Sequence, residues 1–161
     1  MAIEIERKFL VADVSATVAW RAAPGVAIRQ GYLSRDKHRT VRVRVAGNAG
    51  FLTIKGVNVG ATRTEFEYAI PVADAHALLA LCEGPLVEKT RHVVVHQGTT
   101  WEVDDFAGDN AGLVVAEVEL QNETQAFSRP DWLGEEVTQD ARYFNSNLAR
   151  QPFNTWGGEL R

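Results

Sequence analysis

Hydrophobic and polar residues alternate along much of this chain, as they do in β-strands with one apolar and one polar face. The first instance is IEIERKFLV, residues 3–11, in which Glu4, Glu6 and Lys8 occupy every second position. In an extended strand these three side chains lie on one face, with neighbours roughly 6.6–7 Å apart. Taken alone, this segment predicts a strand whose charged face lies in water.

Similar short segments, rich in Val, Ile, Thr and Phe, recur between turn signals such as AGNAG and GVNVG, and this composition is typical of strands. Because the connections are short, we expect neighbouring strands to pair antiparallel. The eight expected strands lie near residues 3–11, 28–34, 39–46, 51–56, 62–70, 86–96, 99–105 and 113–121.

Helical patterns are fewer, and three segments carry them. DAHALLALCE starts with Asp74 as the expected N-cap, NETQAFS predicts a short helix over 122–128, and QDARYFNSNLARQ, residues 139–151, ends before Pro152 with Asp140 as the expected cap. Strands and helices together predict one α+β domain spanning residues 1–161. Residues 153–161 are expected to form a C-terminal extension, either ordered or frayed.

Composition narrows the class of protein. The chain has 161 residues, 45% of them hydrophobic and 24% charged, which is ordinary for a soluble globular domain. Its net charge of −4 argues against a broadly basic nucleic-acid binder. The single cysteine, Cys82, excludes an internal disulfide, fits a reducing cytosol and is expected to pack in the interior. No apolar run approaches the ~18–20 residues of a membrane span, and the acidic, strand-like start is unlike a signal peptide. We therefore expect a cytoplasmic protein.

The alternating charges recur in seven of the expected strands, and most strands carry a single sign. The later members are Arg42 and Arg44, Lys55, Glu65 and Glu67, Lys89 and Arg91, Glu102 and Asp104, and Glu117 and Glu119. A sheet with one face in water does not need this sorting, because mixed signs relieve repulsion between neighbours. The chain has only four lysines, and three of them belong to this set.

A barrel with the charged faces inward, and the apolar faces outward under the helices, satisfies both sets of residues and removes exposed sheet edges. Its interior would be a polar tunnel, with the hydrophobic core outside the wall. Such a lumen is costly to desolvate unless water and ions fill it. Arginine and lysine suit phosphate oxygens, and carboxylates suit hard ions such as Mg²⁺ or Mn²⁺. The pattern therefore predicts a site for a phosphate chain with a divalent metal.

Competing motifs are weak. The sequence has neither GxxxxGK[ST] nor GxGxxG, and no serine is placed as an evident nucleophile. His92 and His96 have the spacing of a zinc-binding helix, but they lie in a β-patterned run without the glutamate of HExxH, so we expect structural roles. His38 and His76 are expected to be solvated.

The segment EIERKF resembles the N-terminal Glu-x-Glu-x-Lys signature of the CYTH superfamily, the triphosphate tunnel metalloenzymes. Further landmarks follow in the family's order: RQGYL, VRVR, TIK, EFE, EKTR, EVD, AEVEL in place of VEVEL, and WLGEEVTQDARYFNSNLA. The similarity covers nearly the whole chain apart from its C-terminal tail. It implies a closed eight-stranded antiparallel β-barrel with flanking helices, which binds a triphosphate with one or two divalent ions.

The resemblance also implies roles for individual residues. The main metal-site carboxylates would be Glu4, Glu6, Glu117 and Glu119. Additional acids that hold a second ion or tune the basic residues would be Glu65, Glu67, Glu102 and Asp104. The phosphate ligands would be Lys8, Arg42, Arg44, Lys55, Lys89 and Arg91, and Arg142 on the C-terminal helix would reach a tunnel mouth. Tyr32 would touch the terminal phosphate or the attacking water, or else simply fill the lumen. Lys8, Tyr32, Arg42 and Glu119 are the expected catalytic residues.

The activity that the resemblance implies is hydrolysis of a phosphoanhydride assisted by Mg²⁺ or Mn²⁺, as in the short bacterial inorganic triphosphatases. Alternatives of the same fold are a class IV adenylyl cyclase and a thiamine or nucleoside triphosphatase. A non-catalytic polyphosphate-binding module and an ordinary sheet protein with a charged face in water also stay open. We expect a small-molecule triphosphate as partner, no nucleic acid or membrane, and a monomer or homodimer.

Overall fold

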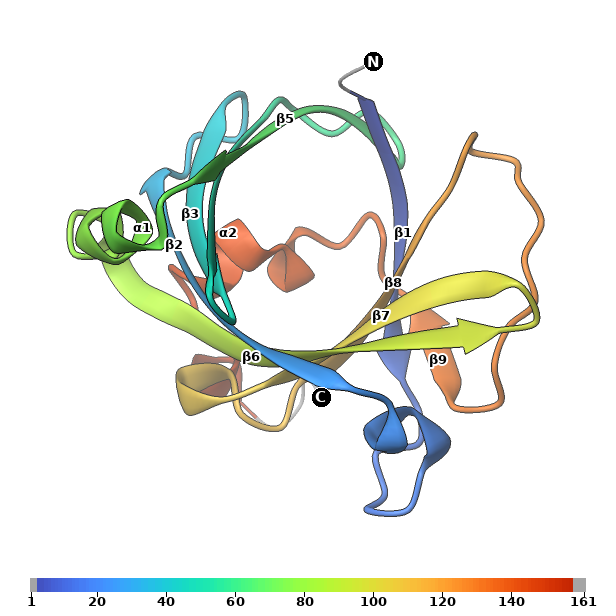
Figure 1. Cartoon of the computed structure of the whole chain (residues 1–161). Coiled ribbons are helices and arrows are strands. Elements are labelled where there is room, and N and C mark those ends of the chain that lie inside the picture. Colours follow the sequence, from blue (N-terminus) through green and yellow to red (C-terminus); the bar gives the residue numbers. More distant parts are fainter. Residues whose placement is uncertain (1–2, 158–161) are drawn as a thin grey trace.

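The computed structural model describes residues 3–157, and within this range nine strands form one antiparallel sheet. Their order is β5-β4-β3-β2-β6-β7-β8-β1-β9, and β1 also pairs with β5, so that β1 to β8 close into a barrel with β9 outside it (Figure 1). The strands are β1 Ile3–Val11, β2 Gly25–Ser34, β3 Thr40–Ala46, β4 Ala49–Lys55, β5 Thr62–Ile70, β6 Glu83–His96, β7 Thr99–Phe106, β8 Val114–Glu119 and β9 Leu133–Glu136. The closed eight-stranded antiparallel barrel is confirmed.

Strand β1 holds the barrel together, because it contacts three other strands. One edge pairs with β8, and this ladder sets Glu6 opposite Glu119 and Lys8 opposite Glu117. The other edge pairs first with β5, over residues 3–5, and then with β9 at Phe9 and Val11. The seam that closes the barrel is therefore only three residue pairs long. Strand β9 was not expected from the sequence, since LGEE does not alternate; it forms by pairing with the remaining free edge of β1.

The helical elements are shorter than the sequence predicts. They are α1 Val72–Leu79, α2 Asn145–Leu148 and four 3-10 turns, η1 Ala19–Ala22, η2 Gly108–Asn110, η3 Ala141–Tyr143 and η4 Phe153–Thr155. Pro71, not Asp74, caps α1. Cys82 follows α1 instead of lying on it, and packs partly buried against the barrel.

The expected helix over 122–128 is absent, because side chains there bond the backbone and compete with helix formation. Asn122 Oδ1 accepts from the Thr124 N–H at 3.0 Å, and Gln125 Oε1 accepts from the Gln121 N–H. The expected helix over 139–151 is broken in two by the extended backbone of Phe144. Its predicted cap is correct in part, since the Asp140 side chain accepts from the Arg142 N–H of η3.

Two of the three hydrophobic clusters lie outside the barrel wall, as expected. One gathers around Trp101, Phe9 and Trp132, and another lies between α1 and the outer face of β3. The third was not expected, because it fills one end of the lumen. It consists of inward-facing strand residues together with the C-terminal segment: Leu10, Tyr32, Val87, Phe106, Leu113, Val115, Val137, Tyr143, Leu148, Ala149, Phe153 and Trp156.

The inward faces of the strands therefore change from charged to apolar along their length. On β1, β6, β7 and β8 the inward charged residue nearest this end lies two positions from an apolar one, which comes after it on β1 and β7 and before it on β6 and β8. Lys8 is followed by Leu10, and the corresponding pairs on the other strands are Lys89 and Val87, Asp104 and Phe106, and Glu117 and Val115. The expectation that the whole core lies outside the wall is wrong, because the lumen is polar in its middle and apolar at one end. Of the C-terminal extension, Phe153 and Trp156 belong to this inner cluster, and residues 158–161 lie outside the described part of the chain.

Helices cover only part of the outer surface. In Figure 1, α1 lies outside the ring of strands beside β2 and β3. On the outer faces of β4 and β5, Ile54, Phe66 and Tyr68 are exposed, so the expected cover of helices is incomplete there. Within residues 3–157, the structure contains no helix that is both long and apolar enough to cross a membrane.

Candidate active site

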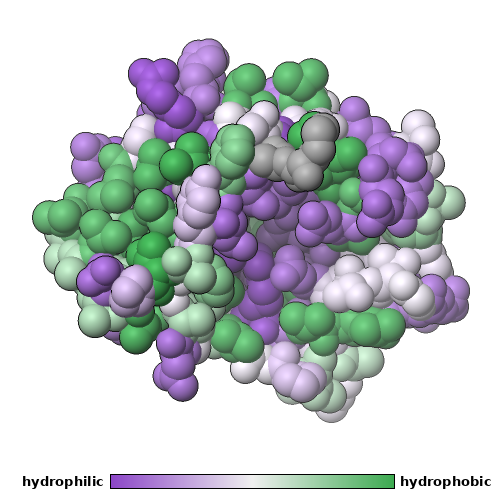
Figure 2. Space-filling model, turned by 45° about the horizontal axis from the view of Figure 1, so that its top comes forward, coloured by the Kyte–Doolittle hydropathy of each residue, from purple (hydrophilic) through white to green (hydrophobic). Residues whose placement is uncertain are grey.

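The middle of the barrel encloses a cavity of about 210 Å³, visible in Figure 2 as a hollow with hydrophilic walls. The charged side chains that line it alternate with outward-facing neighbours on their strands, which is why they share the interior. The carboxylates are Glu4, Glu6, Glu65, Glu67, Glu102, Glu117 and Glu119, and the cations are Lys8, Arg42, Arg44, Lys55, Arg63 and Arg91. The structure thus brings together most of the residues that the sequence singles out.

Strands β1 and β8 supply a cluster of carboxylates. Burial raises the pKa of Glu6 well above its usual range, and repulsion from Glu117 raises it further. Glu117 behaves in the opposite way: burial opposes its ionisation, but Lys8, the hydrogen bond with Glu6, and Arg91 together hold its pKa well below the usual range. Glu119, opposite Glu6, has a pKa raised by burial and by Glu4 and Glu65. This side of the cavity therefore has more negative charge than its neighbours compensate.

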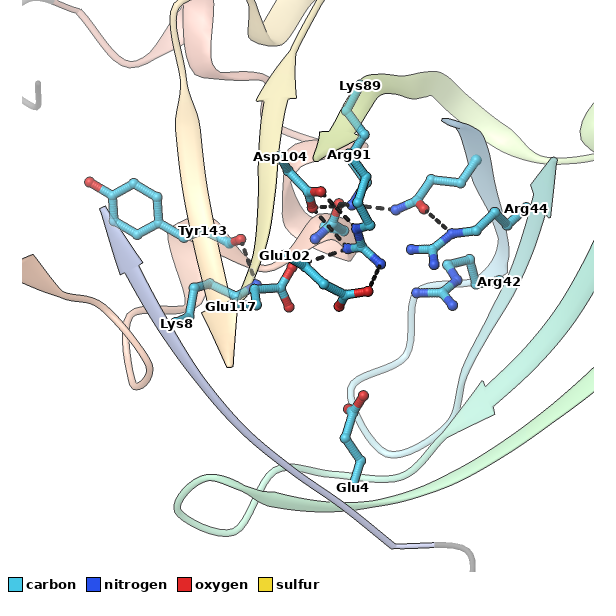
Figure 3. A network of polar contacts seen from close by, with 12 residues as sticks. Glu4, Lys8, Arg42, Arg44, Lys89, Arg91, Glu102, Asp104, Glu117 and Tyr143 are labelled. Atoms are coloured by element: carbon cyan, nitrogen blue, oxygen red, sulfur yellow. Dashed lines mark hydrogen bonds and ion pairs between the residues drawn. The ribbon is translucent and has the colours of Figure 1, made fainter. Parts of the chain in front are cut away.

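Strand β3 supplies two arginines with the opposite imbalance. Arg42 donates from Nη2 to Thr53 Oγ1 at 3.1 Å and lies 3.5 Å from Glu67, while its buried Nε has no partner in residues 3–157. Arg44 donates from Nε to the neutral Gln30 Oε1 at 2.8 Å. Burial, with repulsion from Arg42 and Arg91, lowers the pKa of Arg44 to about 9. These guanidinium groups point toward one another and toward Arg91 (Figure 3), which suits a polyanion between them.

Arg91 is held by three carboxylates. Its Nε and Nη2 donate to the two oxygens of Asp104 at 2.8 and 2.9 Å, and further contacts reach Glu102 and Glu117 at 3.3 Å. Lys89 also donates to Asp104, at 2.8 Å. The side chains of Lys89 and Asp104 are both 0% exposed, and neither lines the cavity. Lys89 and Asp104 therefore lie away from the cavity lining, where Asp104 holds Arg91 and Lys89 binds Asp104.

Burial of Lys89 has an electrostatic consequence. It lowers the pKa of Lys89 to about 7 against the attraction of Asp104, and the nearby Arg91 and Arg44 act in the same direction as burial. The pKa of Asp104 is lowered despite its own burial, because Lys89 and Arg91 share its charge. The single carboxylate of Asp104 thus pairs with two cations, Lys89 and Arg91, where no solvent reaches it.

Lys55 lies within ion-pair distance of Glu4 and Glu65, at 3.0 and 3.2 Å. Lys8 reaches the filled end of the cavity, where its Nζ donates to the backbone oxygen of Tyr143 at 3.2 Å and lies 5.6 Å from the Phe144 ring centre. Tyr32 both lines the cavity and packs in the inner apolar cluster, so it does fill the lumen.

Arg142 does not line the cavity. It lies on η3, not on a helix reaching a mouth, and its guanidinium pairs with Asp140 at 2.6 Å on the surface. The two histidines with zinc-like spacing have structural contacts instead: His92 Nδ1 lies 2.9 Å from the Ala23 oxygen, and His96 Nε2 lies 3.3 Å from Ser128 Oγ.

The comparisons with known proteins agree with this geometry. The CYTH domain matches residues 2–151. The chain belongs to the CYTH domain family. It is 49% identical over 157 residues to an inorganic triphosphatase of Acetivibrio thermocellus, covering 97% of this chain and 99% of the relative. An inorganic triphosphatase of Nitrosomonas europaea is 42% identical over 150 residues, covering 91% and 96%. A solved structure of an inorganic triphosphatase superposes with a TM-score of 0.65 at 40% identity, covering 92% of this chain and 95% of the other.

The donor set of this CYTH domain fits a hard divalent cation, because Glu4, Glu6, Glu117 and Glu119 offer only oxygen. Within residues 3–157 no three Asp, Glu, His or Cys side chains form a ready-made metal cage. Hard divalent ions take carboxylate oxygens, and Mg²⁺ completes its shell with waters and substrate phosphates. The residues present therefore fit the metal that the family implies.

Sequence analysis missed several residues that line the cavity of this CYTH domain. Arg63 is one, although it lies in phase with Glu65 and Glu67 on β5; its guanidinium donates to the Gly56 oxygen at 2.9 and 3.1 Å. The others are uncharged and come largely from irregular segments, where no alternation marks them: Thr40, Asn58, Gly60, Ala61, Thr138, Phe144, Asn145 and Ser146.

Proposed function

We propose that this CYTH domain is a divalent-metal-dependent inorganic triphosphatase, which hydrolyses triphosphate to diphosphate and phosphate. One observation carries the proposal: the same cavity has uncompensated carboxylates on β1 and β8 and under-compensated arginines on β3. A phosphate chain with a bound cation supplies both missing charges at once. The relatives with 49% and 42% identity are named inorganic triphosphatases, which supports the same substrate.

The residues would divide the work by position. Arg42, Arg44 and Arg91 bind non-bridging phosphate oxygens, and Lys8 places a compact charge where negative charge grows as the terminal P–O bond breaks. Glu6 and Glu117, with Glu4 and Glu119, hold the metal. When bound, the metal neutralises phosphate charge and helps to activate water for in-line attack. The water oxygen bonds to the terminal phosphorus and gives up a proton to solvent, while the bond from that phosphorus to the bridging oxygen breaks and diphosphate leaves with that oxygen.

The remaining assignments follow from the same picture. We expect Lys55 to touch phosphate and to tune Glu4, and Glu65, Glu67 and Glu102 to keep the arginines oriented or to hold a second ion. Tyr32 would contact the terminal phosphate from the filled end. We also expect Mg²⁺ or Mn²⁺ as the metal, a cytoplasmic location, no nucleic-acid partner, and a monomer or homodimer.

The decisive experiment incubates the purified protein with triphosphate, ATP or thiamine triphosphate, each with Mg²⁺, Mn²⁺ or EDTA. We expect phosphate and diphosphate from triphosphate, in a metal-dependent reaction that is faster than with either organic substrate. Arg44→Ala should weaken this activity, while Arg29→Ala serves as a matched control, because Arg29 pairs with Glu88 outside the barrel. Cyclic AMP from ATP would make the protein an adenylyl cyclase, and tight triphosphate binding without turnover would make it a binding module.

A further inference from the structure

Two phosphate-facing arginines, Arg44 on β3 and Arg91 on β6, are joined by a continuous chain of buried and partly buried side chains. Arg44 Nε donates to Gln30 Oε1 at 2.8 Å, and Gln30 Nε2 donates to Asn145 Oδ1 at 3.0 Å. The same Asn145 oxygen accepts from Lys89 Nζ at 3.0 Å, and Lys89 donates to Asp104, which binds Arg91. Gln30 and Asp104 are 0% exposed and Lys89 is 3% exposed.

Arg44 and Lys89, which can only donate hydrogen bonds, fix the orientation of both side-chain amides in this chain. Arginine and lysine only donate, so Arg44 requires the oxygen of the Gln30 amide, and Lys89 requires the oxygen of the Asn145 amide. With Oε1 used by Arg44, Gln30 turns its NH₂ group to Asn145, whose oxygen is the acceptor that this NH₂ needs. No amide can be flipped without setting two donors or two acceptors against each other.

We propose that Asn145 and Gln30 are positioning residues that hold Arg44 and Arg91 in place for the triphosphate before it binds. Asn145 lies on α2, in the segment that fills one end of the barrel, so the C-terminal segment reaches the arginines through one amide. The need for such support follows from charge, because Arg44, Arg91 and Lys89 repel one another in a buried region. Pre-oriented donors stabilise developing charge without reorganising during the reaction.

Three substitutions separate the links of the chain. Gln30→Met cuts the link to Arg44 and leaves Lys89 bonded to Asn145. Asn145→Ala removes the acceptor that both branches share. Asn147→Ala is the matched control: Asn147 is the same residue type on the same short helix, but its contact is with the exposed backbone oxygen of Arg142.

The first measurement is solvent exchange of the arginine Nε–H protons by NMR in the substrate-free protein. In Gln30→Met, exchange of the Arg44 Nε–H should accelerate at least about tenfold while that of Arg91 stays unchanged; in Asn145→Ala both should accelerate. Unchanged exchange at both arginines in folded Asn145→Ala would overturn the proposal. If Asn145→Ala does not fold, the asymmetric response of Gln30→Met decides, and equal acceleration or none at all would overturn it.

The second measurement rests on the proposed triphosphatase function, whereas the first does not. Gln30→Met should lower kcat/KM for triphosphate about tenfold, and this loss should nearly vanish when it is introduced into Arg44→Ala, because the two residues then share one effect. Additive losses would mean that Gln30 does not act through Arg44. A wild-type protein without triphosphatase activity would refute the proposed function and leave the exchange test standing.

Discussion

The two sides of the cavity carry unbalanced charges of opposite sign. On β1 and β8, the carboxylates of Glu6 and Glu117 lie close together, and the pKa of Glu6 rises because Glu6 is buried and because Glu117 repels its charge. On β3, Arg42 keeps a buried Nε without a partner in the described chain, and Arg44 donates to a neutral amide. Between them, Arg91 is fully compensated by three carboxylates. The two unbalanced sides indicate where a cation and a polyanion would bind, and Arg91 lines the cavity between them as a donor already oriented by its carboxylates.

The largest effect should come from the acidic side. Glu117→Gln removes the charge on which Glu6, Lys8 and Arg91 converge, and with it a proposed metal ligand. We expect kcat for triphosphate to fall at least a hundredfold, equivalent to about 2.7 kcal/mol, and the metal concentration needed for half-maximal rate to rise. Glu88→Gln, on the outside of β6, controls for loss of a carboxylate. A rate close to that of the control would remove Glu117 from the metal site.

Substitution of Lys8 tests the part of the cavity that lies between its acidic and basic sides. Lys8→Ala should lower kcat/KM at least tenfold, about 1.4 kcal/mol, because the transition state loses a compact cation beside the carboxylates. Lys8→Arg should rescue only part of this, since a planar fork does not replace an ammonium group in a crowded lumen. Steady-state kinetics and a thermal melt with and without triphosphate check it. Wild-type kinetics together with undiminished stabilisation by triphosphate would show that Lys8 is not a site residue.

Because the pKa of Glu6 is raised in the folded protein, the free energy of unfolding should depend on pH. Its pKa is higher in the folded than in the unfolded protein, so between the two values the folded state holds more protons and stability falls as pH rises. Without metal at mildly alkaline pH, we expect Glu6→Gln to be more stable than wild type by about 1 kcal/mol, a Tm increase of about 2–4 °C. Near about pH 4 the difference should vanish, because wild-type Glu6 is then protonated.

Adding Mg²⁺ sharpens the same test. Metal should stabilise the wild type more than Glu6→Gln, because the carboxylate is a proposed ligand and the amide carries no charge. Equal stabilisation of both proteins by Mg²⁺ in calorimetry would contradict a metal site at Glu6.

The smallest effect should come from Arg142, which belongs to neither side. Its guanidinium is paired with Asp140 on the surface, so Arg142→Ala should change kcat/KM by less than about twofold, as surface changes usually do. Triphosphate kinetics measured beside those of Arg44→Ala provide the comparison. A loss as large as that of Arg44→Ala would mean that the η3 segment moves toward the cavity when substrate binds.

The barrel and most of its lining could be predicted because a period of two fixes which residues share a face. How deep each inward-facing side chain lies within the lumen could not be predicted from the sequence. Lys89 and Arg91 face inward alike, but Lys89 lies two positions nearer the filled end along β6, where its side chain is fully buried. Asn145 gives no signal of any kind, since it lies in an irregular segment and gains its role only from Gln30 and Lys89. Arg142 was misplaced because the extended backbone of Phe144 ends the expected helix.

The position of β1 in the sheet has a consequence during synthesis. This strand leaves the ribosome before the other strands of the barrel, but its main partner β8 begins only at Val114. At about 5–20 residues per second, the nascent strand waits on the order of 5–20 s for that partner. During this time an alternating strand with a free edge is at risk of pairing with other chains. The charges of Glu4, Glu6 and Lys8 oppose such pairing, so the residues proposed for the chemistry also protect the unfinished chain.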